Sequence, residues 1–161
     1  MLFKPDIKLD KITDISLELL KEKGITALIL DVDNTLSTHH GMTLTEGLEE
    51  WLALMCENGI KFIILSNSKE KRVKPFAQKI NLEFVASGLK PLPFKFFTAL
   101  KRLGASRRQA AVVGDQLFTD SLGAHLSGIT AIILDPILPE TMWGFRLKRY
   151  LEKILYSFYK F

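Results

Sequence analysis

The chain contains a single cysteine and no long apolar run, and both absences narrow the classes of protein it can belong to. Cys56 cannot form an internal disulfide, which favours a reducing compartment. It lies in an apolar helical stretch, where we expect a small core residue. No stretch approaches the roughly 18 uninterrupted apolar residues of a membrane span, and the N-terminus lacks the pattern of a secretory signal. We therefore expect a cytoplasmic protein, for which peripheral contact with the inner face of a membrane stays open.

The sequence also lacks internal repeats, low-complexity tracts and flexible linkers, so we expect one domain over residues 1–161. With 47% hydrophobic and 25% charged residues, the composition is that of a globular chain. The formal net charge of +4 suits anionic partners, which include phosphorylated metabolites, nucleic acids and acidic lipid surfaces. The basic residues are dispersed and form no aromatic-basic platform, so we expect no nucleic-acid partner. The oligomeric state is left open.

Short apolar runs alternate with helical patterns along most of the chain. Such an alternation predicts an α/β fold with a mainly parallel sheet that is covered by helices on both faces. The helix over residues 69–80 contains Pro75, where we expect an interruption or a kink. The expected strands are residues 25–30, 60–65, 83–86, 110–113 and 129–134, and the expected helices are residues 14–24, 45–58, 69–80, 93–103 and 119–127.

Polar residues whose side chains could take part in catalysis or binding follow four of these strands. Because right-handed crossovers bring the carboxyl ends of parallel strands to one edge, we expect these side chains to meet in the crevice there. Each motif alone is common in ordinary turns and caps, but their joint occurrence in this order favours a reaction centre. The residues are Asp31, Asp33, Ser66, Asn67, Lys90, Asp115 and Asp120.

The pair Asp31 and Asp33 can carry out phosphoryl transfer. A carboxylate that attacks a phosphoryl group forms an aspartyl-phosphate and divides hydrolysis into two easier displacements. A second carboxyl group can protonate the leaving oxygen and then deprotonate the attacking water. Two anions repel a phosphate, so a divalent cation is needed, and Mg²⁺ prefers oxygen ligands of this kind.

The remaining candidates complete such a site. Asp115 can supply a third carboxylate to the cation, while Asp120 can bind it through water or orient Asp115. Ser66 and its neighbour Asn67 offer a hydroxyl and backbone amides to the phosphoryl oxygens. Lys90 offers a fixed positive charge to the same group.

Together these residues resemble the signature of the haloacid dehalogenase (HAD) superfamily over a core from about residue 25 to about residue 134. Their details are similar to those of the IIIA-type phosphatases, and among these to phosphatidylglycerophosphate phosphatases. The resemblance implies a Rossmann-like three-layer sandwich. It also implies that Asp31 is the nucleophile, that Asp33 is the general acid and base, and that Mg²⁺ binds to Asp31, the backbone carbonyl of Asp33 and Asp115.

Members of the superfamily with large caps insert a domain between the first and third motifs, and this chain has no room for one. We therefore expect a capless protein with a small flap at residues 37–45 and an open mouth, which admits bulky or surface-bound substrates. His39 and His40 lie in this flap. Nothing else there resembles a ligand set, so a solvated or substrate-contacting pair is favoured over a metal or acid-base role.

The C-terminal segment predicts an amphipathic helix over residues 142–160. Two interpretations stay open, since the apolar arc can pack on the domain or bind an anionic bilayer through its basic border. The arc comprises Trp143, Leu147, Tyr150, Leu151, Ile154, Leu155 and Phe158, and the basic border comprises Arg146, Arg149, Lys153 and Lys160.

The sequence thus predicts a Mg²⁺-dependent phosphomonoesterase that acts through an aspartyl-phosphate. The favoured substrate is lipid-linked, with phosphatidylglycerophosphate converted to phosphatidylglycerol. Two alternatives remain: a phosphatase for soluble sugar or nucleotide phosphates, and a non-catalytic module that binds Mg²⁺ and phosphate.

Overall fold

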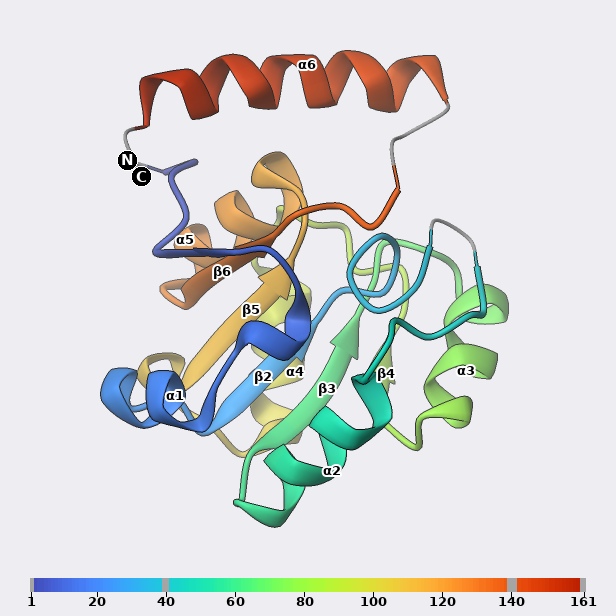
Figure 1. Cartoon of the computed structure of the whole chain (residues 1–161), viewed down its shortest axis with the longest axis vertical. Coiled ribbons are helices and arrows are strands. Elements are labelled where there is room, and N and C mark those ends of the chain that lie inside the picture. Colours follow the sequence, from blue (N-terminus) through green and yellow to red (C-terminus); the bar gives the residue numbers. More distant parts are fainter. Residues whose placement is uncertain (1, 39–40, 139–141, 160–161) are drawn as a thin grey trace.

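A computed structural model describes residues 2–38, 41–138 and 142–159 (Figure 1). Within these ranges, six strands form one parallel sheet in the spatial order β1-β6-β5-β2-β3-β4. This arrangement confirms the expected α/β fold. The strands are β1 (Ile7–Leu9), β2 (Ala27–Leu30), β3 (Lys61–Leu65), β4 (Phe84–Val85), β5 (Ala110–Gly114) and β6 (Thr130–Leu134).

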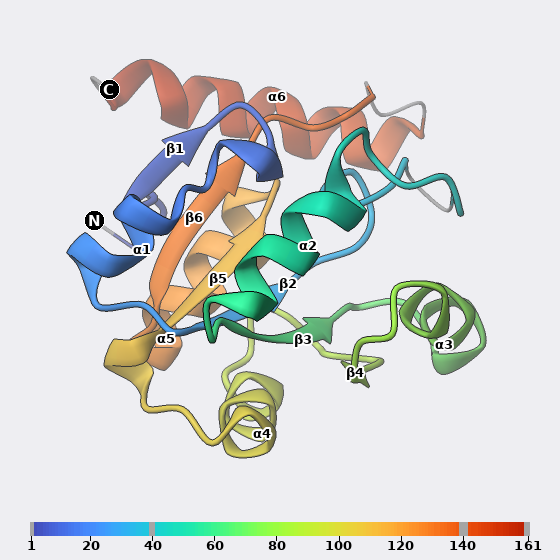
Figure 2. The same ribbon diagram turned by 60° about the horizontal axis from the view of Figure 1, so that its bottom comes forward.

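Two layers of helices cover the sheet, as the uniformly apolar strands require. The helices α1 (Leu17–Lys23), α2 (Leu48–Glu57) and α3 (Glu70–Lys79) contribute to the core on one face. The helices α4 (Phe94–Leu103) and α5 (Leu122–Ser127) contribute to the core on the other face (Figure 2). The helix α3 is a single helix that contains Pro75, so of the expected interruption or kink, the interruption is absent from the described chain.

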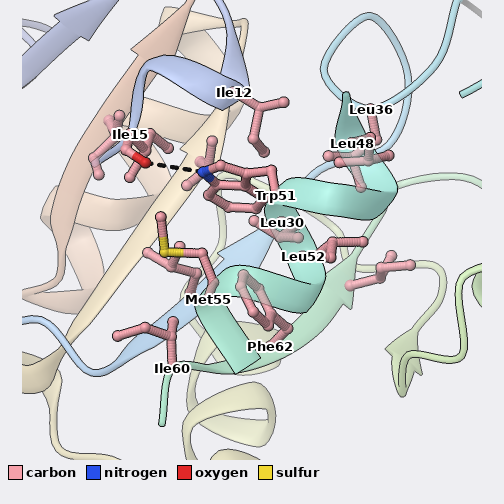
Figure 3. Close-up of a cluster of buried hydrophobic side chains, with 14 of the residues drawn as sticks. Ile12, Ile15, Leu30, Leu36, Leu48, Trp51, Leu52, Met55, Ile60 and Phe62 are labelled. Atoms are coloured by element: carbon pink, nitrogen blue, oxygen red, sulfur yellow. Dashed lines mark hydrogen bonds between the residues drawn. The ribbon is translucent and has the colours of Figure 1, made fainter. Parts of the chain in front are cut away.

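The packing of α2 shows how this core is built. The buried face of α2 comprises Leu48, Trp51, Leu52 and Met55, the residues that the helical period selects (Figure 3). The indole nitrogen Nε1 of Trp51 donates a hydrogen bond of 2.9 Å to the backbone oxygen of Ile15, so this buried polar group is satisfied. The expectation that Cys56 is a core residue is wrong, because Cys56 lies outside this face and is exposed.

The register of the central strands aligns their carboxyl ends at the same edge of the sheet. Leu30 in β2 is paired with Ile64 in β3 and with Val113 in β5. The residues that follow these three positions therefore emerge at the same edge of the sheet. This is where the sequence places its first, second and fourth motifs.

Two elements were not predicted. The strand β1 pairs with β6 at the edge of the sheet but has only three residues, all half-buried, so it leaves little apolar signal. The expected helix over residues 119–127 begins with a π-helical turn, η3 (Leu117–Ser121), before α5. Short 3₁₀ turns, η1 (Ile12–Asp14) and η2 (Arg107–Gln109), precede α1 and β5.

The last helix, α6 (Trp143–Phe158), crosses above the carboxyl ends of the strands (Figure 1). Its bounds agree closely with the predicted range of 142–160. None of the described helices has the length and apolar character that a bilayer crossing requires.

Candidate active site

The level strand ends open into a small cavity. Its volume is about 270 Å³, and it lies at the carboxyl edge of the sheet as predicted. Residues from the segments that carry all four motifs line this cavity together with two residues of α6. The lining comprises Asp31, Asp33, Ser66, Asn67, Ser68, Lys90, Gln116, Thr119, Phe145 and Lys148.

Lys90 forms the electrostatic centre of the site. Its Nζ atom donates hydrogen bonds to Oδ1 of Asp31 at 2.8 Å and to Oδ1 of Asp120 at 2.6 Å. All three side chains are at least nine-tenths buried. Burial alone would lower the pKa of Lys90, but the two carboxylates outweigh it, so the pKa is raised and the ammonium stays charged.

The pKa values of Asp31 and Asp115 are raised in this arrangement. Burial raises the pKa of Asp31 to about 6, because the opposing attraction of Lys90 only partly compensates and Asp120 adds repulsion. Burial also raises the pKa of Asp115 well above its usual value, against the opposing effect of Arg149. For both carboxyl groups, burial therefore outweighs the attraction of the neighbouring cation.

Asn67 connects the second motif to the third. The Lys90 backbone nitrogen donates a hydrogen bond of 2.7 Å to Oδ1 of Asn67, and Nδ2 of Asn67 donates one of 3.2 Å to the Lys90 carbonyl. The side chain of Asn67 thus holds the backbone that carries the ammonium. The hydroxyl of Ser66 accepts a hydrogen bond of 3.2 Å from the backbone nitrogen of Ser68, which orders the loop after β3.

Asp33 lies at the cavity wall and is held by groups that the sequence did not single out as site residues. Arg72 of α3 forms an ion pair of 3.0 Å with Oδ1 of Asp33, and the hydroxyl of Ser68 donates a hydrogen bond of 3.2 Å to Oδ2. Arg72 also donates a hydrogen bond of 2.7 Å to the carbonyl of Gly41 in the flap. Arg72 therefore links the flap to the acid-base candidate.

Three of the carboxylates fit a divalent cation. Oxygens of Asp31, Asp115 and Asp120 lie within 4.8 Å of one another. Both oxygens of Asp120 have donors, since Oδ2 accepts a hydrogen bond of 3.2 Å from the nitrogen of Gln116. By contrast, Oδ1 of Asp115 is buried and has no hydrogen-bond partner among the residues that the structure describes. Mg²⁺ prefers carboxylate oxygens as ligands, and a buried carboxylate oxygen that lacks a hydrogen-bond partner is free to bind such an ion.

Gly114 permits this close packing of carboxylates. A Cβ atom at position 114 would overlap the side chain of Asp120. Only glycine therefore allows Asp120 to lie against the end of β5 beside Asp115. Asp120 consequently lies beside Asp115, with a carboxylate oxygen within 4.8 Å of oxygens of Asp31 and Asp115.

The helix α6 is held over the site by its charged side. Arg149 forms an ion pair with Oδ2 of Asp115 and donates a hydrogen bond of 2.7 Å to the Asp115 carbonyl. It also pairs at 3.0 Å with Glu152, whose other oxygen accepts a hydrogen bond of 2.8 Å from the nitrogen of Leu117. Lys148 donates to the side chain of Gln116. These contacts bury Glu152 almost completely.

This placement corrects one expectation and bears on the two interpretations of the apolar arc. The mouth of the site is less open than expected, because Phe145 and Lys148 of α6 contribute to the lining of the cavity. The apolar arc does not pack on the domain, because six of its seven members are exposed and Leu155 is partly buried. The helical period located the arc correctly but could not indicate which side of the helix contacts the protein. His39 and His40 lie outside the described residues, as does Lys160.

Comparisons with known proteins place the chain in a phosphatase family. The family model described as mitochondrial PGP phosphatase matches residues 1–138. The Bacillus subtilis protein named probable phosphatase YqeG is 34% identical over 155 residues, which cover 96% of this chain and 90% of that protein. The matched family segment ends before α6 begins.

Solved structures show the same fold. A hydrolase of HAD subfamily III A from Legionella pneumophila superposes with a TM-score of 0.51 and 24% identity, over 62% of this chain and 60% of that one. A 4-nitrophenylphosphatase from Thermotoga maritima superposes with a TM-score of 0.61 and 13% identity, over 76% of this chain and 89% of that one.

The buried position of Lys90 makes a prediction about stability. A Lys90→Met substitution leaves Asp31 and Asp120 buried without their cation, so we expect a loss of about 3–5 kcal/mol in the free energy of unfolding near pH 7. Removal of the ammonium takes away an interaction that lowers the pKa of Asp31, so this pKa rises further in the folded state only. The folded state therefore gains protons more readily, and the deficit relative to the unsubstituted protein shrinks as the pH falls toward about 5.

Urea unfolding at both pH values measures this effect. The control is Lys8→Met, which removes an ion pair with Asp135 near the surface and is expected to change stability by about 0–1 kcal/mol. Equal losses in the two variants, or a loss in Lys90→Met that does not depend on pH, would contradict the assignment.

Proposed function

The chain belongs to the family of mitochondrial PGP phosphatases, which is a phosphatase family of the HAD type, and from this we propose that it hydrolyses phosphatidylglycerophosphate through Asp31 with the help of Mg²⁺. As a member of this family it is a phosphoric monoester hydrolase. The substrate, the metal dependence and the roles of individual residues are the proposed part. The observation that carries them is the pairing of Asp31 with the Lys90 ammonium at the wall of the cavity.

Asp31 is the proposed nucleophile. An oxygen of its carboxylate attacks phosphorus, the bond between phosphorus and the ester oxygen breaks, and an aspartyl-phosphate forms. A pKa of about 6 leaves this carboxylate largely ionised at neutral pH. The ammonium of Lys90, 2.8 Å from Oδ1, offsets the negative charge that the nucleophile and the phosphoryl group bring together.

Asp33 is the proposed acid and base. It gives a proton to the leaving ester oxygen, and then takes a proton from the water that attacks the phosphorus of the aspartyl-phosphate. This second displacement releases inorganic phosphate and restores Asp31. Its ion pair with Arg72 and its hydrogen bond from Ser68 support a fixed orientation toward the cavity. The hydroxyl of Ser66 is proposed to bind the phosphoryl oxygens.

Asp31 and Asp115 are the proposed ligands of Mg²⁺, together with the backbone carbonyl of Asp33 and with Asp120 adjacent. The unpartnered Oδ1 of Asp115 supports this set. When bound, the cation neutralises the carboxylates and the phosphoryl group. Arg149 holds the other oxygen of Asp115, which limits the rotation of that ligand.

A lipid-linked substrate is supported by the description of the family and by the cationic and aromatic residues that α6 adds to the mouth, Lys148 and Phe145. Soluble sugar or nucleotide phosphates are the alternative substrates. A non-catalytic role is disfavoured, because the nucleophile, the acid-base residue and Lys90 are all present.

Trapping the covalent intermediate tests the roles of the two aspartates. With a substrate whose phosphomonoester carries ³²P, we expect Asp33→Asn to accumulate labelled protein after a rapid acid quench, because its second displacement is slowed. Asp31→Asn should acquire no label and should lose activity by at least about 10³-fold, as expected for removal of a nucleophile. Hydrolysis by Asp31→Asn at the unsubstituted rate would exclude Asp31 as the nucleophile.

A substrate panel tests the proposed ester. With Mg²⁺ present, we expect phosphatidylglycerophosphate in vesicles to give a kcat/KM at least about tenfold above that of soluble esters such as glycerol phosphate, because remote lipid contacts contribute binding energy. Chelation of Mg²⁺ by EDTA should abolish both activities, and added Mg²⁺ should restore them. Turnover of soluble esters alone would refute the lipid substrate, and full activity in EDTA would refute the metal dependence.

A further inference from the structure

The helix α6 has two sides with opposite chemistry, and its apolar side faces away from the domain. Its inner side carries Lys148, Arg149 and Glu152, which bind the site as described above. Its outer face, defined here as Trp143, Leu147, Tyr150, Leu151, Ile154 and Phe158, is exposed, and Trp143 and Phe158 expose 77% and 73% of their surface. Figure 1 shows α6 on the outside of the molecule, above the strand ends.

This orientation is fixed by the inner side. The ion pair of Arg149 with Asp115 is partly buried and the hydrogen bond from Leu117 to Glu152 is buried, so rotation of α6 about its axis would leave these charges unpaired. The outer face therefore cannot turn inward without breaking the site. An exposed apolar row of this extent on one helix indicates a surface that binds something else.

A groove runs along one flank of the outer face. Its volume is about 630 Å³, and it combines four apolar or aromatic side chains with three cations. Two of the cations, Arg146 and Lys153, are exposed and form no ion pair in the part of the chain that the structure describes. The lining comprises Pro136, Trp143, Arg146, Leu147, Arg149, Tyr150 and Lys153.

This lining is suited to an anionic amphiphile. Phosphates are bound by guanidinium and ammonium groups, and aromatic residues such as Trp143 and Tyr150 suit the boundary between headgroups and acyl chains. A second copy of the chain is a poor occupant, because the one acidic residue of α6, Glu152, is buried on the inner side. Two such faces brought together would oppose cations without partners.

We propose that the outer face of α6 and its flanking groove bind the surface of an anionic phospholipid bilayer, with headgroup phosphates on Arg146 and Lys153 and with the apolar row among the upper acyl chains. This proposal extends the proposed function, and it depends on that function only in assuming that the substrate is a lipid. Because α6 also contributes Phe145 and Lys148 to the active-site cavity, binding in this way holds that cavity beside the bilayer surface.

Vesicle flotation of the full chain tests the proposal. The probes are vesicles of phosphatidylcholine alone and vesicles of phosphatidylcholine with phosphatidylglycerol, neither of which contains a phosphomonoester. We expect the unsubstituted protein to float with the anionic vesicles. The double variant Leu147→Ser/Ile154→Ser should bind at least about tenfold more weakly, because its apolar row is interrupted.

The charge variant Arg146→Glu/Lys153→Glu should lose the preference for anionic vesicles. The control is Leu54→Ser, which removes a leucine of α2 that is about as exposed as Leu147 but does not belong to α6. This variant should bind as the unsubstituted protein does. All four proteins should hydrolyse a soluble ester at equal rates, because none of these residues lines the active-site cavity.

Three outcomes would overturn the proposal: no flotation of the unsubstituted protein, equal flotation of all variants, or a dimer in light scattering that the Leu147→Ser/Ile154→Ser variant abolishes. Soluble-ester hydrolysis without vesicle binding would refute this inference alone. If the protein binds vesicles but hydrolyses no phosphomonoester, the proposed function is refuted, while the proposal that α6 binds a bilayer remains supported.

Discussion

The ammonium of Lys90 lies between the buried carboxylates of Asp31 and Asp120, and the rest of the site depends on this contact. With Asp115 included, three buried carboxylates share the positive charges of Lys90 and Arg149. The negative charge remains in excess, and the pKa values of Asp31 and Asp115 are raised mainly by burial, with a smaller contribution from the neighbouring carboxylates. A divalent cation would remove this excess, which is why the arrangement favours metal-assisted chemistry on a phosphate.

The fold holds these charged groups close together because each of them is attached to a rigid element. Asp31 follows β2, Asp115 follows β5, and Lys90 is held through its backbone by Asn67 after β3. The parallel register levels these strand ends, so the groups meet without long loops. The chemistry is therefore a property of the topology as much as of the motifs.

Much of the fold and of the candidate site could be predicted, because buried parallel strands leave continuous apolar runs and the motifs follow directly after them. The strand β1 escaped prediction because three half-buried residues carry no such signal. Arg72 and Arg149 escaped because one helix of basic residues and one amphipathic helix gave no indication of which cation reaches a carboxylate. In α6 the ion pairs determine the orientation, against the usual tendency of an apolar arc to pack inward.

The account as a whole rests on one cation site formed by Asp31 and Asp115, with Asp120 beside them and the Lys90 ammonium next to it. The most direct test is a crystal structure of the protein soaked in Mn²⁺, in which anomalous scattering locates the ion. The account predicts a peak at coordination distance from carboxylate oxygens of both Asp31 and Asp115. Ordered Mn²⁺ bound elsewhere, with the two carboxylates lacking a shared ion, would contradict it.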